Sequence, residues 1–282
     1  MKKKDLLIGC HLSISGGISR SVERAKEIGC TAFQIFTSNP RGWSKNELSQ
    51  EEITRFREGI KETGIFPIAH MPYLPNLAAP DKEIYKKSVE QLIIELERCE
   101  SLGITYIVTH LGSHLGTGEE EGRKRIVDAI RIAISKANSS TMILLENTAG
   151  TRNSLGSAPN DLARIISELN GGKRIGVCID TAHAFAAGYD WREPENKFYS
   201  EINEVKLKSR IKVLHFNDSK VDLNGKADRH EHIGLGKIGL SGLALILKNS
   251  LFQNIPIILE TPVDDRRDDK SNLDAAKKLV NE

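Results

Sequence analysis

Six residues of the kinds that bind metal ions each follow a short apolar run between positions 70 and 260 of this 282-residue chain. The runs are IFPIA, YIVT, MILL, IGVCI, VL and IPIIL, and the residues that end them are His70, His110, Glu146, Asp180, His215 and Glu260. Successive members lie 40, 36, 34, 35 and 45 residues apart, which suits one strand, one helix and two loops each time. Imidazole nitrogens and carboxylate oxygens are ligands that zinc and manganese accept. The pattern therefore predicts a metal centre where parallel strands end.

Three further residues of these types lie in loops. His183 follows Asp180 by three residues, and Asp228 and His230 belong to the segment DRHEH, where they would face the same side if it is extended. One histidine or glutamate at a strand end is more often a hydrogen-bonded residue than a ligand. Nine candidates, however, exceed one tetrahedral site, and converging carboxylates repel one another without a cation. The remaining histidines, His11, His114 and His232, are expected to orient ligands. His114 could instead be an ordinary loop residue.

The elements between these residues are read from hydrophobic periodicity. Two more apolar runs, at 6–10 and 32–37, bring the number of expected strands to eight. Apolar residues at three- and four-residue spacing predict helices between the strands, at 18–28, 82–103, 122–138, 162–169, 195–210 and 268–281. Strict alternation predicts a parallel sheet covered by helices, and eight units predict an α/β fold of the (β/α)8 TIM-barrel type. We expect one domain over residues 1–282 with the active site at the C-terminal ends of the strands; a doubly wound open sheet is the alternative.

Composition limits the cellular compartments and the binding partners that the protein is expected to have. The 40 lysine and arginine residues nearly balance 38 acidic residues, so a nucleic acid would have to bind a local patch. The four cysteines form no C-x-x-C pair, which favours free buried thiols in a reducing cytosol over disulfides or zinc–cysteine sites. The apolar run near the N-terminus is too short for a signal peptide, and no stretch approaches the roughly 20 apolar residues of a membrane span. We expect a soluble cytoplasmic protein with no membrane partner.

The chemistry that such a centre favours is hydrolysis. Bound metal ions activate water, hold an anionic substrate and neutralise a leaving alkoxide. Phosphate esters need this assistance most, because their uncatalysed hydrolysis is extremely slow. The sequence contains no G-x-S-x-G elbow, no G-x-x-x-x-G-K-[ST] loop and no G-x-G-x-x-G after the first strand. Metal-assisted phosphodiester hydrolysis is therefore the predicted reaction.

Several segments also resemble a known family. They are LENTAG (145–150), CIDTAHAFAAGYD (178–190), HFNDSK (215–220), DRHEHIGLGKIG (228–239) and LETP (259–262), and GCHLSISGG (9–17) and FTSNPRGW (36–43) extend the match. Together they are similar to the endonuclease IV family, the zinc-dependent apurinic/apyrimidinic endonucleases of base excision repair. The resemblance runs over essentially the whole chain.

This resemblance implies a TIM barrel with three zinc ions that cleaves double-stranded DNA on the 5′ side of an abasic site and leaves a 3′-hydroxyl. We expect a monomer, which is the default for an enzyme that bends DNA across one open face. Manganese is an alternative metal at one or more sites. By similarity, the first ion would be held by His70, His110 and a bridging Glu146, the second by Asp180, His215 and Glu260, and the third by His183, Asp228 and His230. Those expected to act in catalysis are Glu146, His110, Asp180 and Glu260. Arg41, Tyr73 and Leu74 would enter the minor groove and unstack the abasic nucleotide.

Three positions depart from the family pattern, and two other functions remain open. Leu111, Thr151 and Ala182 stand where proline, glycine and cysteine are more usual, which bears on loop shape and substrate preference. A sugar isomerase or epimerase would gather the last four strand-end residues around a single divalent ion on the same barrel. A DNA-damage binding protein could keep the fold without turnover. The five additional ligand candidates argue against the isomerase, and the intact set argues against the binding protein.

Overall fold

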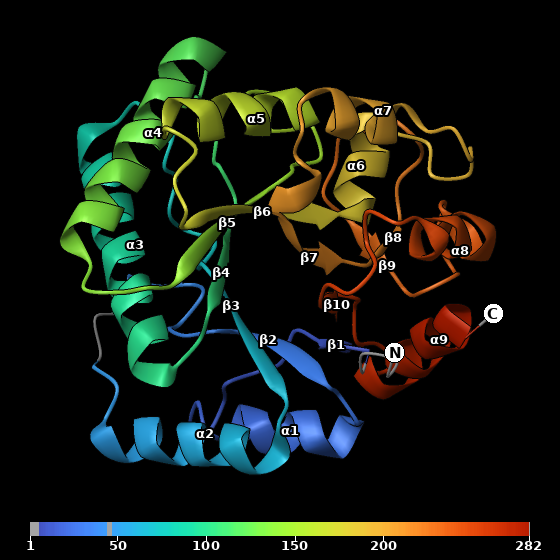
Figure 1. The fold of residues 1–282 in the computed structure, drawn as a ribbon, viewed down its shortest axis with the longest axis horizontal. Helices are drawn as coiled ribbons and strands as arrows, with labels where there is room; N and C mark the ends of the chain where they lie inside the picture. Colours follow the sequence, from blue (N-terminus) through green and yellow to red (C-terminus); the bar gives the residue numbers. More distant parts are fainter. Residues whose placement is uncertain (1–5, 44–46, 282) are drawn as a thin grey trace.

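Eight parallel strands form one sheet that curves into a barrel, and helices cover its outer face in the computed structural model (Figure 1). The structure describes residues 6–43 and 47–281. The barrel strands are β1 (Ile8–Cys10), β2 (Ala32–Phe36), β3 (Phe66–His70), β4 (Tyr106–Thr109), β5 (Met142–Glu146), β6 (Ile175–Asp180), β7 (Ile211–His215) and β10 (Ile257–Leu259). Their order around the sheet is β1-β10-β7-β6-β5-β4-β3-β2. Two short antiparallel strands, β8 (Asp218–Ser219) and β9 (His230–Glu231), lie in the segment after β7.

The barrel closes between β1 and β2. The Thr31 N–H donates to Ile8 O at 2.9 Å, and the Leu12 N–H donates to Gln34 O at 2.7 Å. Gly9 makes this approach feasible, because a Cβ at that position would lie 1.7 Å from the carbonyl oxygen of Ala32. The predicted TIM barrel is therefore confirmed, and the open-sheet alternative is wrong.

Helices alternate with the strands along most of the chain. They are α1 (Arg20–Ile28), α2 (Gln50–Thr63), α3 (Lys82–Leu102), α4 (Glu119–Lys136), α5 (Pro159–Glu168), α6 (Thr181–Ala187), α7 (Lys197–Glu204), α8 (Gly239–Lys248) and α9 (Asp269–Asn281). Local signals set several ends: the Asp81 side chain accepts the N–H of Ile84 at the start of α3, and Gly103 ends that helix in the left-handed region. The helix predicted at 195–210 is shorter, since α7 ends at Glu204 and a separate 3₁₀ turn spans Lys208–Arg210.

Two apolar cores hold the layers together. The larger one lies between the sheet and the helices. A smaller one, which we call the interior cluster, consists of one residue from each of seven strands: Ala32, Ile68, Val108, Leu144, Cys178, Val213 and Ile258. Because side chains alternate across a strand, the residue two positions after each member also points into the barrel. The sequence therefore places a layer of side chains directly above the interior cluster.

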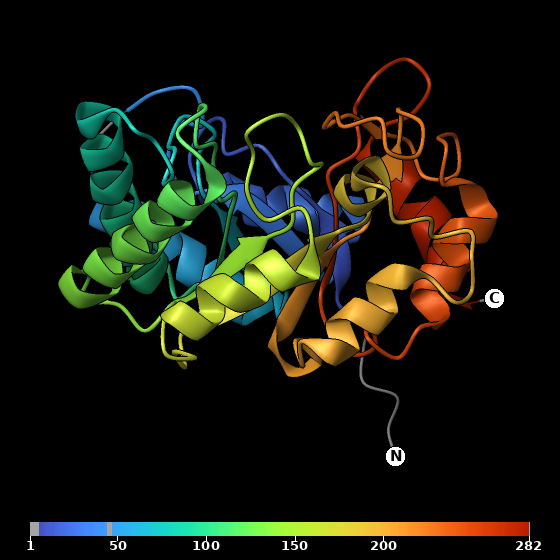
Figure 2. The same ribbon diagram turned by 90° about the horizontal axis from the view of Figure 1, so that it is seen from above.

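Loops that continue from the strands gather at one end of the barrel, including the yellow-green loop after β5 and the orange segment after β7 (Figure 2). All four cysteines are buried and free, as predicted. Among the described residues, no helix is long and apolar enough to cross a membrane.

Candidate metal centre

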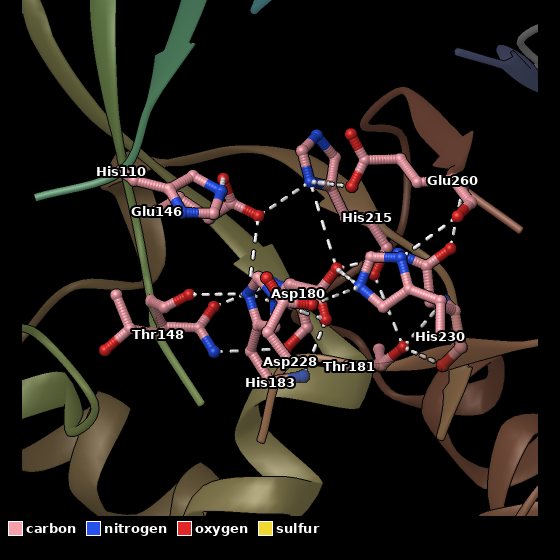
Figure 3. Close-up of polar contacts among 12 residues, drawn as sticks. His110, Glu146, Thr148, Asp180, Thr181, His183, His215, Asp228, His230 and Glu260 are labelled. Carbon is pink, nitrogen blue, oxygen red and sulfur yellow. Dashed lines mark hydrogen bonds and ion pairs between the residues drawn. The ribbon is translucent and has the colours of Figure 1, made fainter. Parts of the chain in front are cut away.

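The six strand-end residues converge at the end of the barrel where the loops gather. Figure 3 shows five of them, His110, Glu146, Asp180, His215 and Glu260. Each comes two residues after a member of the interior cluster, so strand alternation turns its side chain into the barrel. The same rule adds Gln34, two residues after Ala32. His11 comes two residues after Gly9, which pairs with Ile258 of the interior cluster at the corresponding position of β1. The ligand layer, as we name this set, is His11, Gln34, His70, His110, Glu146, Asp180, His215 and Glu260.

The first group of potential ligands surrounds one carboxylate oxygen. Glu146 Oε2 lies 3.2 Å from His70 Nε2 and 3.1 Å from His110 Nε2. Metal–ligand distances of 2.0–2.1 Å in a tetrahedral site set neighbouring ligand atoms about 3.3 Å apart. The spacing of these three atoms thus suits one shared ion.

The second group lies around His215. Its Nδ1 is 2.9 Å from Glu146 Oε1 and 3.1 Å from Glu260 Oε2, and Asp180 Oδ2 is 3.9 Å away. These four residues offer ligand atoms that all lie within 4.8 Å of one another. Glu146 therefore belongs to both groups, one oxygen to each, which is the arrangement required of a bridging ligand.

The third group joins α6 to the segment after β7. His183 Nε2 lies 3.1 Å from Asp228 Oδ1, and His230 Nε2 lies 3.5 Å from the same oxygen. Asp180 Oδ2 is also 3.5 Å from His230 Nε2, so Asp180 adjoins the second and third groups. The structure thus brings together all nine residues that the sequence singled out as ligand candidates.

Hydrogen bonds on the far side of the imidazole rings bear on whether these groups suit a metal. Nδ1 of His70 contacts Met71 O at 2.7 Å, that of His183 contacts Asn147 O at 2.9 Å, and that of His230 contacts Glu260 O at 3.0 Å. A carbonyl only accepts, so each Nδ1 carries a proton, and whenever the ring is neutral its Nε2 directs a lone pair toward carboxylate oxygens that are acceptors as well. Nε2 of His183 and of His230 is buried and has no hydrogen-bond partner. Lone pairs of imidazole nitrogens and of the Asp228 oxygen that face one another at 3.1 and 3.5 Å fit a cation between them.

The electrostatics of the centre favour positive charge. Burial opposes an imidazolium at His183, but Asp180 and Asp228 outweigh it and raise the pKa of His183 well above its ordinary value. Burial would likewise raise the pKa of Glu146, yet His110 and His215 hold that pKa well below its usual range. The buried Glu146 carboxylate therefore stays ionised, and the centre attracts cations.

Sequence reasoning missed three amides that hold the potential ligands. Asn147 Nδ2 donates to Asp180 O, and its Oδ1 accepts the Asp180 N–H at 2.7 Å. Asn217 Nδ2 donates to Asp180 Oδ2 at 2.7 Å, and its Oδ1 accepts the Glu260 N–H at 2.8 Å. Gln34 contacts His215 and Glu260. The available signal was position: Gln34 stands in the alternation after Ala32, and each asparagine comes one or two residues after a predicted ligand.

The other three histidines differ in role. His11 lies 3.4 Å from Glu260 Oε1, which agrees with an orienting residue. His114 Nδ1 accepts the N–H groups of Gly116 and Gly118, so it shapes its own loop. His232 contacts Asp264 and Asn272, which support a neighbouring loop rather than a ligand.

None of the three departures from the family pattern replaces a potential ligand. Leu111 and Ala182 are buried apolar residues, and Thr151 is exposed at a turn where its carbonyl accepts the Ser154 N–H. Their effect on loop shape and substrate preference stays a prediction.

A cavity of about 360 Å³ opens onto the centre. Its lining is His70, Tyr73, His110, His183, Asp228, Arg229, His230, Glu260 and Pro262. Tyr73 is 65% exposed and its ring packs edge-on against Phe36 at 5.1 Å, and Leu74 is 42% exposed beside it. Arg41 is exposed in the loop after β2, and its N–H donates to Asn39 Oδ1. The three expected DNA-contacting residues thus present exposed side chains on loops after β2 and β3.

Comparison with known proteins gives the class first. A family model described as a xylose isomerase-like TIM barrel matches residues 22–281. The fold alone is shared with 3-keto-D-glucoside 4-epimerase of E. coli, at a TM-score of 0.70 and 18% identity over 98% of this chain and 100% of that one. The chain belongs to this class of TIM-barrel proteins.

More similar proteins give the family. "Probable endonuclease 4" of Cenarchaeum symbiosum (strain A) is 51% identical over 97% of this chain and 99% of its own length. The crystal structure of endonuclease IV from Thermus thermophilus superposes with a TM-score of 0.85 at 34% identity, covering 97% of this chain and 98% of that one. The chain belongs to the endonuclease IV family; it is a hydrolase, a DNA-repair endonuclease of a metal-dependent family.

Proposed function

We propose that this chain hydrolyses the phosphodiester on the 5′ side of an abasic site in duplex DNA and leaves a 3′-hydroxyl, as a step of base excision repair. The observation that carries the proposal is the convergence of nine histidine and carboxylate side chains in three groups around Glu146 and Asp180. The entire chain, residues 1–282, would act as one endonuclease domain, as a monomer in the cytoplasm.

The proposed ligands correspond to the three groups. His70, His110 and Glu146 would hold the first zinc ion, Glu146, Asp180, His215 and Glu260 the second, and His183, Asp228 and His230 the third. Manganese suits the same ligands at one or more positions. When bound, the ions would supply Lewis-acid activation of the phosphodiester and of the attacking water, and would neutralise charge on the leaving oxygen.

The residues that act directly in catalysis would be Glu146, His110, Asp180 and Glu260. Glu146 and Asp180 have no exposed surface, so they keep their orientation while DNA binds. Arg229 brings a guanidinium to the wall of the cavity, where it can pair with a phosphate oxygen. The cavity would exclude bulk water around the scissile bond, because DNA would cover its open side.

Recognition of the lesion would depend on exposed loop residues. Arg41, Tyr73 and Leu74 are proposed to enter the minor groove and unstack the damaged nucleotide. Unstacking a step costs a few kcal/mol and costs least where a base is missing. The wedge therefore favours abasic sites, and the local positive charge of Arg41 compensates for a net charge of only +2 over the chain.

A sugar isomerase of the same class would use the group of Glu146, Asp180, His215 and Glu260 around one divalent ion. The first and third groups would then have no role, although His183 and His230 each direct a buried, unpaired Nε2 toward a carboxylate. This surplus supports the nuclease. Elemental analysis separates the two: three tightly held zinc ions per chain support the nuclease, and one loosely held ion that magnesium replaces supports the isomerase.

A nicking assay tests the proposed reaction. The substrate is a labelled duplex with one abasic analogue, and the control is the same duplex with an intact base. We expect a single cut 5′ to the analogue, and extension of the new end by a DNA polymerase would identify a 3′-hydroxyl. Binding without a cut would support a damage-binding protein and overturn the proposed activity.

A further inference from the structure

Gln34 is a neutral amide in a layer whose other members are all histidine, aspartate or glutamate. It lies on β2, two residues after Ala32 of the interior cluster, and has no exposed surface. Burying an amide is unfavourable unless its hydrogen bonds are made. The hydrogen-bond partners of Gln34 therefore indicate its role in the ligand layer.

The amide makes three hydrogen bonds, which use both of its ends. Gln34 Oε1 lies 2.9 Å from His215 Nε2, and Gln34 Nε2 lies 2.7 Å from Glu260 Oε1. Its Nε2 also lies 2.9 Å from His11 Nδ1. The opposite orientation of the amide would set two oxygens 2.7 Å apart, so the carboxylate fixes which end is nitrogen.

This orientation determines the state of two proposed ligands. The amide oxygen only accepts, so His215 Nε2 must carry a proton and donate it, and a neutral His215 then keeps its lone pair on Nδ1. That Nδ1 is the nitrogen that faces Glu146 Oε1 at 2.9 Å and Glu260 Oε2 at 3.1 Å. The amide nitrogen, in turn, occupies Glu260 Oε1 and leaves Oε2 facing His215.

We propose that Gln34 is a positioning residue for the second metal group: it selects the Nδ1-ligating form of His215 and holds Glu260 with Oε2 toward the ion. This inference rests on the proposed function, since it concerns one of the proposed zinc sites. Removing an outer hydrogen-bond partner of a metal ligand weakens metal binding by about 10–100-fold. The effect should be confined to the second group, because Gln34 contacts neither His70, His110 nor the third group among the contacts the structure records.

The test compares Gln34→Met with the wild-type protein by competitive zinc titration against a chromophoric chelator. Methionine keeps the length of the side chain and removes all three hydrogen bonds. We expect wild type to bind three zinc ions and Gln34→Met to bind one of them about 10–100-fold more weakly. A second readout is the long-range ¹H–¹⁵N spectrum of the zinc-loaded protein, in which the Nε2–H of His215 should exchange faster with water in the variant.

Gln91→Met is the matched control. Gln91 is another buried glutamine, on α3, and its amide donates to Glu95 Oε1 at 2.8 Å away from the proposed ligands. It should lose a buried amide's hydrogen bonds without losing zinc affinity. Gln34→Glu serves if Gln34→Met folds poorly: a carboxylate still accepts from His215 but no longer donates to Glu260, so zinc affinity should fall while the His215 N–H signal persists.

The outcomes separate this inference from the proposed function. Wild-type protein that holds three zinc ions, with Gln34→Met and Gln34→Glu binding them equally tightly, overturns the positioning role alone. Wild-type protein that holds no zinc overturns both. Selective weakening of one ion in Gln34→Met, with Gln91→Met unchanged, supports the assignment.

Discussion

Replacing Glu146 by glutamine should disable two metal positions at once. The carboxylate faces His70 Nε2 at 3.2 Å and His110 Nε2 at 3.1 Å with one oxygen, and His215 Nδ1 at 2.9 Å with the other. Glutamine has nearly the same volume, so the barrel should fold. Its amide, however, carries no charge and presents N–H groups to at least one side of the bridge.

The magnitude depends on the two groups that share this residue. A contact to a charged group is worth about 1.5–3 kcal/mol, so its loss at two ions amounts to about 3–6 kcal/mol. That corresponds to a factor of about 10²–10⁴ in the product of the two binding constants. We expect Glu146→Gln to lose about two of the three zinc ions during gel filtration with a weak chelator, and to cleave abasic DNA at least about 100-fold more slowly.

Two assays and one control test this expectation. Zinc is counted by elemental analysis, and cleavage is measured on a duplex with one abasic analogue. Glu95→Gln is the control for metal content, because Glu95 is also fully buried but pairs with Thr37, Ser38 and Gln91 instead of the proposed ligands. Full zinc content together with full cleavage in Glu146→Gln would refute the bridging role.

Three further changes test other parts of the molecule. Tyr73→Ala removes a 65% exposed ring, and aromatic stacking on a base is worth about 1–3 kcal/mol, so binding to abasic duplex should weaken by about 5–150-fold in fluorescence anisotropy. An equal loss of affinity for intact duplex would mean that Tyr73 only packs against Phe36. An ion present at 100 times its Kd adds about 2.7 kcal/mol of stability, so removing the metals with a strong chelator should lower the unfolding temperature in calorimetry by about 4–5 °C for each such ion. An unchanged unfolding temperature would contradict metal binding to the folded chain. Gly9→Ala should destabilise the protein by about 3 kcal/mol or more in urea denaturation, since the new Cβ would lie 1.7 Å from Ala32 O. The control is Gly172→Ala, whose Cβ would meet only atoms at 3.5 Å or more, and it should change stability by less than about 0.5 kcal/mol.

The strand-end pattern predicts most of the fold and most of the centre. The repeated pattern of an apolar run followed by a potential ligand is a consequence of parallel βα units. It can be recognised in the sequence from His70 to Glu260 without knowledge of any tertiary contact. Asp228 and His230 can also be predicted from the sequence, because an i, i+2 pair in an extended segment faces one side. Covalent geometry and periodicity are local properties of the chain, and the features that depend on them alone can be predicted from the sequence.

Residues that act by orienting other side chains cannot be predicted from such a local pattern. An amide such as Gln34 is not a metal ligand, and its role emerges only when β2 is brought across the barrel from β7 and β10. The short helix α6 is not predicted as a helix, because its residues are buried on all sides and show no amphipathic period. The predicted helix at 195–210 is too long, since periodicity does not register the break between Glu204 and Lys208.

The distribution of the ligand layer around the barrel has a consequence for how the protein is made. The second group needs Glu146 from the middle of the chain and Glu260 from the end of β10, which pairs with both β1 and β7. Contacts over such long sequence separations form late in folding, and β10 is synthesised after the other seven barrel strands. A chain that emerges from the ribosome therefore assembles the complete set of ligands last. Zinc would bind tightly only to finished molecules, so the metal that serves repair would also protect complete chains against unfolding and leave truncated ones exposed to proteolysis.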